Sequence, residues 1–520
     1  MKPTMFFLMN SIEIDRGGLT KASLTQASLF AEMGYKVYMV TFNFNPKYPL
    51  IRKKLVEMGK LHKNVIVLNM FEELEGNKNP IKANKPAHKL SLKKLAKNYT
   101  LHKKKGHNIY RAYDNGMYVK YYSLRKNGSL DFIDFFNENR YRTKREQYDP
   151  WGNLRKIEFM DFQLNKPRQV LYYDLKGRVY FSQWNDPESN KVQRIQTFKK
   201  TGDIKNVYIN DNISHKKEWL KSIINKHGSS PSVMISDTRS TDAVLAAFHH
   251  PQVAKMWRLH SSHCNTQDVM NDEIAGKVKT GIDNLHKYDV ALFLTEEQKE
   301  DVIKRLGNKT SYYVLPNYYE PKKTSNFNAV SSEKKDLKLA VIVSRLSTLK
   351  RIDHSIKAFR TVVDNIPDAK LEIWGSGDQE EKLKKLIKDS DLEKNVFLKG
   401  FTHDPDKVYR RGLFSTSTSK REGFPFSILE SMVNGTPVIS YDIKYGPNDM
   451  IEPSENGFII ENNNIDFLAD KMLYMFENPD IAIQMGEKAN KYIEKHFSKD
   501  AYTHKWIEAI DLAIKQKSKG

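Results

Sequence analysis

The second half of the chain alternates short apolar segments with helical stretches, and few folds accept that pattern. Five segments have the length and composition of strands: 339–343, 371–374, 396–398, 413–417 and 437–440. Helical stretches between them are typical of a parallel, doubly wound sheet. After Asn464 the sequence is helical to its end and closes on a basic tail. We therefore expect an α/β domain over 319–500, followed by a C-terminal helix and tail over 501–520.

The first half starts with the same alternation and then leaves it. Apolar 5–9, a loop holding Gly17 and Gly18, a helical stretch over 20–33 and a strand after Lys36 form half of an α/β unit. The α/β pattern returns at 232–236 and continues through 256–259 and 290–294. We expect 1–80 and 208–318 to form one α/β domain, interrupted by an insertion over 81–207.

The inserted segment has a different texture. From 108 to 206, short alternating, aromatic-rich runs are separated by turn sequences at Asn115-Gly116, Asn127-Gly128, Trp151-Gly152 and Lys176-Gly177. Such runs and turns predict β-hairpins arranged as a meander. A weak repeat, Tyr148-Asp149-x-x-Gly152 and Tyr173-Asp174-x-x-Gly177, supports one turn shape used twice. The insertion therefore reads as a basic connector followed by a β-rich domain.

Composition narrows the class of protein. With 520 residues and 39% hydrophobic content, the chain is long enough for two or three domains with sizeable cores. The single cysteine, Cys264, excludes an internal disulfide framework and a Cys-rich zinc site, and it suits a reducing cytoplasm. No apolar run approaches the roughly 18 residues of a membrane helix, and the first apolar stretch is too short for a secretory signal. We expect a soluble, cytoplasmic protein.

The net charge of +22 indicates a polyanionic partner. No acidic residue lies between Glu75 and Asp114, and lysines gather in that window: Lys82, Lys85, Lys89, Lys93, Lys94, Lys97, Lys103, Lys104 and Lys105. Zinc-finger spacing, RNP-type aromatic motifs and basic heptads are all missing, which argues against nucleic acid. The alternative is a solvated, partly helical connector whose Leu90, Leu92 and Leu95 contact the body of the protein.

Two acids with seven residues between them lie in the stretch REGFPFSILESM. Gly423 and Pro425 prevent a helix from running through Glu422, so this acid belongs to a loop. The run from Phe426 has helical spacing, which places Glu430 near the start of a helix. One carboxylate on a loop and another at a helix start suit a ligand with sugar hydroxyls and a phosphate. The alternative is a pair of surface acids around a buried helix.

Two cations follow the first strand of the second α/β domain, in Ser344-Arg345-Leu-Ser-Thr-Leu-Lys350-Arg351. Arg345 and Lys350 bracket the start of a helix, so both charges and the helix N-terminus converge on one point. This arrangement predicts a diphosphate site that neutralises a leaving group without a metal. A solvated basic turn is the alternative, and we expect Arg351 to be a bystander.

Two further positions are candidates. The paired Gly17 and Gly18 let backbone approach a phosphate or sugar, although the absence of Gly-x-Gly-x-x-Gly counts against a dinucleotide enzyme. His260 follows an apolar strand, and strand ends in open α/β sheets face the ligand crevice. His263 is nearby, but no carboxylate lies at ligand spacing, so we expect no metal site.

Together these motifs resemble the family-four GT-B retaining glycosyltransferases over roughly 1–75 and 210–500. More narrowly, the chain is similar to the enzymes that α-glycosylate poly(glycerol-phosphate) or poly(ribitol-phosphate) wall teichoic acid. The resemblance rests on Gly17-Gly18, TRSTD around Asp237, LHSSH with His260, VLPN ending at Asn317, SRLSTLKRID, the acidic pair and Asp442-Ile-Lys-Tyr-Gly-Pro447. The β-rich insertion also distinguishes that subgroup from other members of the family.

The resemblance implies two Rossmann-like domains facing a cleft, the first binding acceptor and the second nucleotide-sugar. Carried over by position, Arg345 and Lys350 would grip the diphosphate, Glu422 the sugar and Glu430 the ribose, with His260 against the sugar. Gly17, Gly18, Gly423 and Phe424 would complete the donor site. The implied reaction is retaining and metal-independent, with a UDP-sugar as co-substrate and no other cofactor. The donor would be UDP-glucose or UDP-N-acetylglucosamine.

The resemblance also supplies a partner for the positive charge. Teichoic acid carries one phosphate per repeat, so clustered lysines would bind it with release of counterions. We assign Lys93, Lys94, Lys103, Lys104 and Lys105 to this acceptor surface. The β-rich insertion implies a homo-oligomer, and the basic surface allows peripheral contact with an anionic membrane. The alternatives are a transferase of Ser-rich adhesins and a non-catalytic, polyanion-binding subunit.

Overall fold

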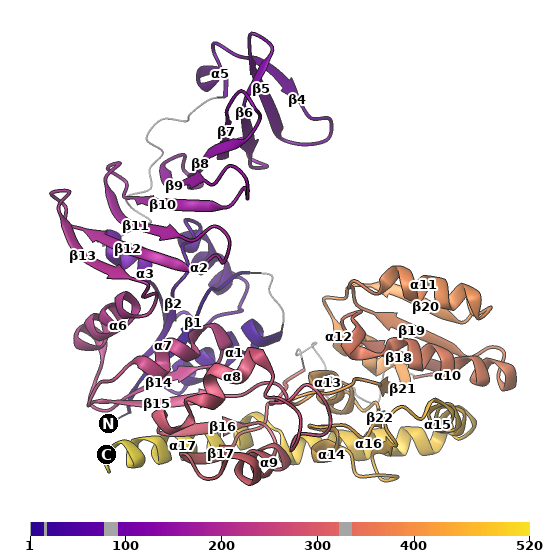
Figure 1. Cartoon of the computed structure of the whole chain (residues 1–520). Coiled ribbons are helices and arrows are strands. Elements are labelled where there is room, and N and C mark those ends of the chain that lie inside the picture. The colour runs from indigo at the N-terminus through magenta and orange to yellow at the C-terminus, as the bar shows by residue number, and fades with distance from the viewer. Residues whose placement is uncertain (1, 15–17, 77–91, 322–334, 520) are drawn as a thin grey trace. The chain divides into compact units, whose positions relative to one another are not determined.

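The computed structural model describes residues 2–14, 18–76, 92–321 and 335–519, and the chain divides into two compact units, Met1–Val253 and Ala254–Gly520 (Figure 1). Each unit combines parallel α/β layers, and the first also carries a large antiparallel sheet. The mixed α/β class predicted from the sequence is confirmed.

In the first unit, four parallel strands lie in the order β14-β1-β2-β3. Their bounds are β1 (Thr4–Met9), β2 (Val37–Thr41), β3 (Val65–Asn69) and β14 (Ser232–Ser236). Helices α1 (Gly18–Glu32), α2 (Tyr48–Glu57), α3 (Met70–Glu75), α6 (Ser214–His227) and α7 (Asp242–Ala247) connect them, with the 3₁₀ turn η1 (Arg239–Thr241) before α7. Every residue of β1, β2 and β14 is buried, because parallel strands covered on both faces are apolar throughout.

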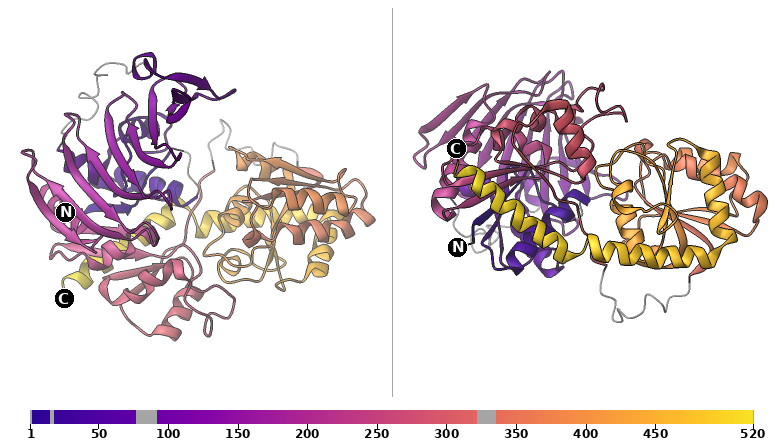
Figure 2. Two further views of the ribbon diagram at one scale, coloured as in Figure 1. Left: turned by 45° about the horizontal axis from the view of Figure 1, so that its top comes forward. Right: turned by 90° about the horizontal axis from the view of Figure 1, so that it is seen from below.

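The inserted segment forms ten antiparallel strands that follow one another side by side in chain order (Figure 2). They are β4 (Thr100–Lys103), β5 (Ile109–Asp114), β6 (Met117–Leu124), β7 (Leu130–Phe136), β8 (Arg142–Tyr148), β9 (Leu154–Met160), β10 (Pro167–Tyr173), β11 (Val179–Asn185), β12 (Val192–Phe198) and β13 (Ile204–Ile209). A short helix, α5 (Leu92–Leu95), precedes them, and its Leu92 and Leu95 pack on a cluster with Tyr122 and Ile133. The meander predicted from the turn sequences is confirmed.

The predicted repeat is a recurring turn. Asp149 Oδ1 accepts from the backbone N–H groups of Trp151 and Asn153, both at 2.9 Å. Asp174 Oδ1 does the same with Lys176 and Arg178, also at 2.9 Å. In both turns the glycine has positive φ, 92° at Gly152 and 76° at Gly177, a conformation that glycine adopts at little cost.

The β-meander is fastened to the α/β layers of the same unit through α3. Phe71 packs against Tyr172 in a tilted arrangement and edge-to-face against Phe181, with ring centroids 4.7 and 5.2 Å apart. The carboxylate of Glu75 pairs with the buried guanidinium of Arg155, and its Oε1 accepts from the Leu175 N–H at 3.2 Å. Aromatic packing and a buried ion pair therefore fix the insertion to the end of α3.

The second unit begins with three parallel strands, β15 (Val253–Arg258), β16 (Val290–Phe293) and β17 (Ser311–Val314). Helices α8 (Gly276–Asp283) and α9 (Glu296–Leu306), the 3₁₀ turn η2 (Leu285–Lys287) and the last helix, α17 (Lys499–Lys517), accompany them. The buried guanidinium of Arg258 donates to Asn317 Oδ1 at 2.9 Å and to the Tyr502 hydroxyl at 3.3 Å. These contacts anchor α17, which follows α16 at the end of the chain (Figure 2, right).

The rest of the second unit is a six-stranded, wholly parallel sheet in the order β20-β19-β18-β21-β22-β23. Its strands are β18 (Asp336–Val343), β19 (Lys370–Trp374), β20 (Val396–Gly400), β21 (Gly412–Ser417), β22 (Val438–Tyr441) and β23 (Gly457–Ile460). Its helices are α10 (Ile352–Asn365), α11 (Glu380–Asp389), α12 (Pro405–Arg411), α13 (Phe426–Val433), α14 (Pro447–Met450), α15 (Ile465–Glu477) and α16 (Pro479–His496), and η3 (Thr348–Lys350) precedes α10. The first five strands match the predicted segments, and β23 is an additional one.

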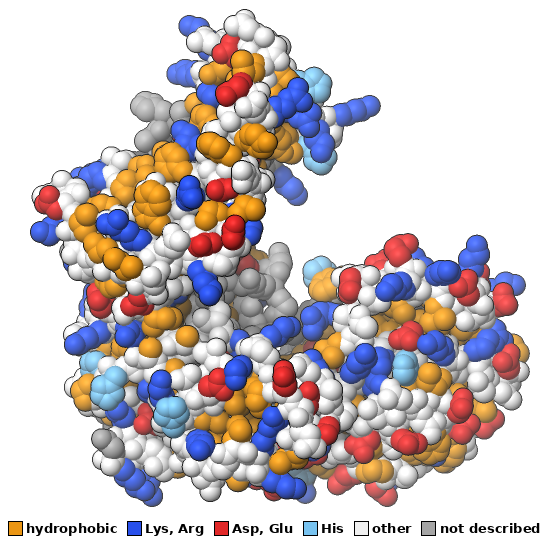
Figure 3. All heavy atoms as spheres, in the orientation of Figure 1, with side chains coloured by type: hydrophobic (Ala, Val, Ile, Leu, Met, Phe, Trp, Pro, Cys, Tyr) orange, Lys and Arg blue, Asp and Glu red, His pale blue; other side chains and the backbone are white. Residues whose placement is uncertain are grey.

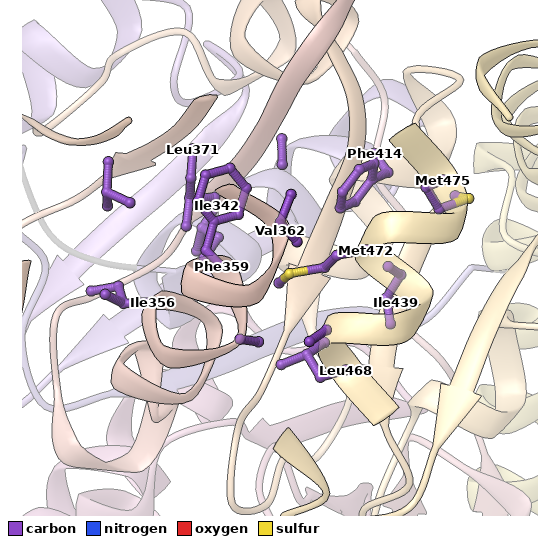
Figure 4. Close-up of a cluster of buried hydrophobic side chains, with 14 of the residues drawn as sticks. Ile342, Ile356, Phe359, Val362, Leu371, Phe414, Ile439, Leu468, Met472 and Met475 are labelled. Carbon is purple, nitrogen blue, oxygen red and sulfur yellow. The ribbon is translucent and has the colours of Figure 1, made fainter. Parts of the chain in front are cut away.

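The core of this sheet lies between its strands and two helices. Figure 4 shows Phe359 and Val362 of α10 and Met472 of α15 gathered against Phe414 and Ile439 of the sheet. All five side chains are buried. Because apolar residues recur at helical spacing on α10 and on α15, each helix has one apolar face, and that face packs against the sheet.

The start of α9 is capped by a side chain. Thr295 is the N-cap residue, and its hydroxyl accepts from the Gln298 N–H at 3.1 Å. A capping box also needs the Gln298 side chain to return to the cap. Instead, Gln298 Nε2 donates to the carbonyl of Ser261 at 2.9 Å, because this buried amide lies against the loop that follows β15.

Candidate active site

The strand order of the six-stranded sheet reverses between β18 and β21. From β18 the chain proceeds to β19 and β20 on one side, and β21, β22 and β23 fill the other side. In open α/β sheets, ligands bind outside the carboxyl ends of the strands at such a switch point. The loops that leave β18 and β21 carry the predicted cations and the first predicted acid.

These two loops are joined by hydrogen bonds to backbone groups. The Thr418 hydroxyl shares its proton between the carbonyls of Lys350 and Arg351, at 3.0 and 2.8 Å. The Lys420 N–H donates to the Leu349 carbonyl at 2.8 Å. The segment that leads to Glu422 therefore positions Lys350 as well.

Lys350 and Glu422 form an ion pair at the switch point. Lys350 Nζ lies 2.5 Å from Glu422 Oε1, and the two side chains are 16% and 15% exposed. An ammonium group has three donors and a carboxylate accepts about four hydrogen bonds, so the pair keeps capacity for a ligand. The ammonium suits phosphate oxygens and the carboxylate suits sugar hydroxyls. The geometry thus offers adjoining places for both ends of a nucleotide-sugar.

Arg351 has a structural role in the same loop. Its buried guanidinium donates from Nε to the Thr418 carbonyl at 2.8 Å and from Nη2 to the Ser419 carbonyl at 2.6 Å. It also lies over the ring of Tyr441, 4.9 Å from the centroid. Because these contacts occupy the guanidinium, Arg351 links the two loops, which agrees with the expectation that it is not one of the diphosphate-binding cations.

Gly423 brings His260 to the acidic loop. A Cβ at position 423 would lie 2.4 Å from the His260 carbonyl oxygen and 2.8 Å from the Ser261 Cα. Only glycine lets the backbone after Glu422 pass so close to the end of β15. His260 itself is partly exposed. The structure therefore brings His260, Gly423, Glu422 and Lys350 together.

Phe424 does not present its ring to this site. Its side chain is 4% exposed and packs against Phe497, with ring centroids 5.3 Å apart. It belongs to a core cluster with Ile428 and Met432 of α13. Any donor contact at this position would have to come from the backbone.

Glu430 lies in the second turn of α13, as its helical spacing predicts, and is partly exposed. Burial is the main cause that raises the pKa of Tyr319, and the negative charges of Glu430 and Asp406 raise it further. The same carboxylate helps to raise the pKa of the buried Tyr409 hydroxyl. Glu430 is therefore within electrostatic reach of both phenols.

Arg345 is exposed just after the end of β18. The residues on either side of it, Ser344 and Leu346, pack against the loop after β19. A Cβ on Gly375 would lie 1.8 Å from the Ser344 carbonyl oxygen, and one on Gly377 would lie 2.1 Å from that of Leu346. These two glycines were not predicted from the sequence, although Gly-x-Gly directly after a strand was the available signal. They let the second strand-end loop support the loop that carries Arg345.

The remaining predicted residues belong to the first unit. Gly17 lies outside the described residues, as do Lys82, Lys85 and Lys89, while Gly18 begins α1. Lys93 and Lys94 lie on α5, with Lys94 exposed, and Lys103, Lys104 and Lys105 are exposed at the end of β4 and in the turn after it. Figure 3 shows Lys and Arg side chains gathered around this part of the β-meander.

Cations and aromatic rings alternate on the neighbouring strands. Lys144 Nζ lies 4.1 Å from the ring centroid of Phe135, and the guanidinium of Arg145 lies 4.1 Å from that of Phe132. Lys120 Nζ lies 4.5 Å from the Tyr99 centroid. Cation–π contacts of this kind hold charged groups above apolar rings. Lys144 and Arg145 also pair with the carboxylates of Glu146 and Asp134, so their charges are neutralised within the module.

Two kinds of feature are absent from the described residues. In the part of the chain that the structure describes, no three His, Cys, Asp or Glu side chains gather as they would around a metal ion. Among the same residues, no helix is long and apolar enough to cross a membrane.

Comparison with known proteins supports the same class. A family model described as Glycosyl transferases group 1 matches residues 323–492, and one described as Glycosyl transferase 1 domain A matches residues 6–198. The structure also matches a crystal structure of a Staphylococcus aureus TarM variant in complex with fondaparinux, α-GlcNAc-glycerol and UDP. That match has a TM-score of 0.81 at 26% identity and covers 98% of this chain and 99% of the other. Fold and site therefore define a glycosyltransferase of the GT-B class.

Two curated relatives extend over almost the whole chain. The sequence is 30% identical over 518 residues to poly(glycerol-phosphate) alpha-glucosyltransferase of Bacillus subtilis, covering 98% of this chain and 75% of that protein. It is 29% identical over 515 residues to poly(ribitol-phosphate) alpha-N-acetylglucosaminyltransferase of Staphylococcus aureus, covering 98% and 99%. The chain belongs to this family of poly(glycerol-phosphate) and poly(ribitol-phosphate) alpha-glycosyltransferases.

Proposed function

We propose that this protein transfers glucose or N-acetylglucosamine from a UDP-sugar to hydroxyl groups of poly(glycerol-phosphate) or poly(ribitol-phosphate) wall teichoic acid. The observation that carries the proposal is the Lys350–Glu422 pair at the switch point of the six-stranded sheet. The names of the two curated relatives supply the donor sugars and the acceptor polymers.

In the proposed donor site, Arg345 and Lys350 bind the diphosphate and Glu422 accepts hydrogen bonds from the sugar. Glu430 binds the ribose, and His260 lies against the sugar at the reacting face. Gly17, Gly18 and the backbone of Gly423 and Phe424 complete the site. The close passage of Gly423 along His260 supports this grouping, because it puts the end of β15 beside the acidic loop.

We propose a retaining reaction that needs no metal. The bond between the sugar anomeric carbon and the diphosphate oxygen breaks, and the acceptor hydroxyl oxygen bonds to the same face of that carbon. The departing phosphate oxygen takes the acceptor proton. Arg345 and Lys350 stabilise the charge that develops on UDP, which is the work of a metal in other transferases. Glu422 pairs with Lys350, and the proposed step forms no covalent glycosyl-enzyme, unlike that of a retaining glycosidase.

The acceptor surface is proposed on the β-meander. Lys94, Lys103, Lys104 and Lys105 are exposed there, and Lys93 lies on the same short helix as Lys94. A polymer with a phosphate in every repeat would displace counterions from such a surface, so its binding would weaken with salt. Self-association through the same module, peripheral contact with an anionic membrane and a cytoplasmic location remain predictions.

The domain division also remains a proposal: an acceptor domain over 1–80 and 208–318, the insertion over 81–207, a nucleotide-sugar domain over 319–500 and a tail over 501–520. The function is tested by UDP release from each donor, with and without each polymer, in EDTA. Release that depends on one polymer identifies donor and acceptor together. If no pair exceeds donor hydrolysis, a Ser-rich protein acceptor or a non-catalytic role becomes the better account.

A further inference from the structure

The backbone of Glu422 is held by a second segment besides the loop of Lys350. The Glu422 N–H donates to the Lys444 carbonyl at 3.1 Å, and the Tyr445 N–H donates to the Glu422 carbonyl at 3.0 Å. These two hydrogen bonds fix the backbone of Glu422 to the segment of Lys444 and Tyr445. A shift of that segment would therefore move the backbone of Glu422 and its carboxylate with it.

The carboxylate of Asp301 on α9 binds the side chains of both residues, and Glu297 on the same helix forms a second, longer ion pair with Lys444 at 3.3 Å. Lys444 Nζ lies 2.5 Å from Asp301 Oδ2, and the Tyr445 hydroxyl donates to the same oxygen at 2.8 Å. The Asp301 side chain is 16% exposed, and Tyr445 is fully buried. Burial and the hydrogen bond to Asp301 raise the pKa of Tyr445, so its hydroxyl stays protonated and keeps donating.

The loop after β15 braces the same segment from another side. The Lys444 N–H donates to Gln267 Oε1 at 2.8 Å, and Gln267 Nε2 donates to the Lys420 carbonyl. The buried ring of His263 stacks on Tyr445, with centroids 6.0 Å apart and planes 18° from parallel. The chain on both sides of Glu422 is therefore tied to residues of α9 and of the loop after β15.

We infer that Asp301 is a positioning residue for sugar transfer. Through Lys444 and Tyr445 it sets where the Glu422 carboxylate meets Lys350. Asp301 does not itself bind Glu422 or Lys350, and its effect on them passes through Lys444 and Tyr445. The inference rests on the proposed function, because it assigns Asp301 to the step in which Glu422 binds the transferred sugar.

The substitution Asp301→Asn tests the inference, because it keeps the size of the side chain and removes the nearer of the two charges that bind Lys444. We expect the kcat for sugar transfer to fall about 10- to 100-fold, the loss typical of a catalytic group displaced by about 1 Å. The Kd for UDP should stay within about threefold, since Asp301 is not assigned to the diphosphate or ribose contacts. Glu300→Gln, at the exposed neighbouring position on α9, is the matched control and should transfer like the wild type.

A second variant covers the case in which Asp301→Asn does not fold. Tyr445→Phe removes only the hydroxyl that Asp301 binds, and it should lower kcat about 3- to 10-fold with the Tm nearly unchanged. Unchanged kcat in the folded variants overturns the inference, as does a fall in UDP affinity and Tm that parallels the fall in kcat. If the wild type itself transfers no sugar, the proposed function has failed instead, which distinguishes the two outcomes.

Discussion

Lys350 and Glu422 are 72 residues apart in the chain, yet their charged groups meet at 2.5 Å. They leave the carboxyl ends of two adjacent parallel strands, β18 and β21, where the strand order of the sheet reverses. The pair thus joins a cation suited to phosphate and an anion suited to sugar hydroxyls at the place where open α/β sheets bind ligands.

Removing either charge should stop sugar transfer. Lys350→Ala removes a cation that stabilises the departing diphosphate, and Glu422→Gln weakens the hold on the sugar. We expect each variant to lose at least about 100-fold in kcat, the size of effect that one stabilising group supplies. Initial rates of polymer-dependent UDP release measure the loss.

The matched control for the cation is Lys385→Ala, at an exposed position on α11. It should keep wild-type turnover, and circular dichroism should show all three variants folded. Full turnover by Lys350→Ala and Glu422→Gln would remove both residues from the catalytic site.

Local features of this site follow from the sequence. Gly423 and Pro425 stop a helix from starting before Phe426, and α13 does begin there, leaving Glu422 in a loop. The strands that precede the two loops could also be predicted from the sequence, because apolar segments between helices indicate parallel strands. These rules act over a few residues, so a single segment contains the whole signal.

Contacts between residues of the site that are far apart in the chain could not be predicted from such local patterns. The sequence around Gly423 does not indicate that this glycine lies against the His260 carbonyl. The sequence around Asp301 likewise does not indicate that Asp301 binds Lys444 and Tyr445. Phe424 was predicted to contact the donor, but its ring fills the core beside α13. Which loops meet depends on the order of the strands in the sheet, and that order cannot be predicted from the local patterns of a single sequence.

Gly423→Ala should inactivate the enzyme without touching any charged group. The new Cβ would lie 2.4 Å from the His260 carbonyl oxygen, so the loop must move and carry Glu422 with it. A displacement of about 1 Å corresponds to roughly a 100-fold loss in kcat. The measurement is kcat together with Tm.

Gly276→Ala serves as the control for that variant, because a Cβ there meets nothing within 4 Å. It should leave kcat unchanged. An active Gly423→Ala enzyme would show that the close passage along His260 is not needed for the chemistry.

The buried ring of His263 should make the protein less stable in mild acid. Burial lowers the pKa of His263 to about 4, from an ordinary value of 6.5. Between these values the unfolded chain binds more protons than the folded one, so stability falls as the pH drops from about 6.5 to about 4. Each unit of difference corresponds to about 1.4 kcal/mol, which limits the loss from this residue to about 3 kcal/mol.

His263→Phe keeps a ring against Tyr445 and removes the titration. Urea unfolding at pH 5, 6 and 7 should show a flatter dependence on pH for this variant than for the wild type. His215, whose pKa burial also lowers, to about 3, is present in both proteins and cancels in the comparison. Equal slopes in the two proteins would show that His263 titrates normally.

The lysines at the end of β4 should affect the acceptor alone. Replacing Lys103, Lys104 and Lys105 by Gln removes three exposed positive charges from the β-meander. We expect the KM for the polymer to rise about tenfold and its dependence on salt to become shallower, because fewer counterions are released. The KM for the UDP-sugar should not change.

A triple replacement of the exposed Lys382, Lys385 and Lys388 on α11 changes the net charge equally and is the control. If both triple variants raise the polymer KM to the same degree, the effect is one of net charge and the acceptor surface lies elsewhere.

The most direct test of the central claim is proton NMR of the polymer after incubation with UDP-glucose or UDP-N-acetylglucosamine in EDTA. The wild type should attach α-linked sugar to poly(glycerol-phosphate) or poly(ribitol-phosphate), and Glu422→Gln should leave the polymer unmodified. A β-linked product, or no sugar on either polymer from either donor, would contradict the account.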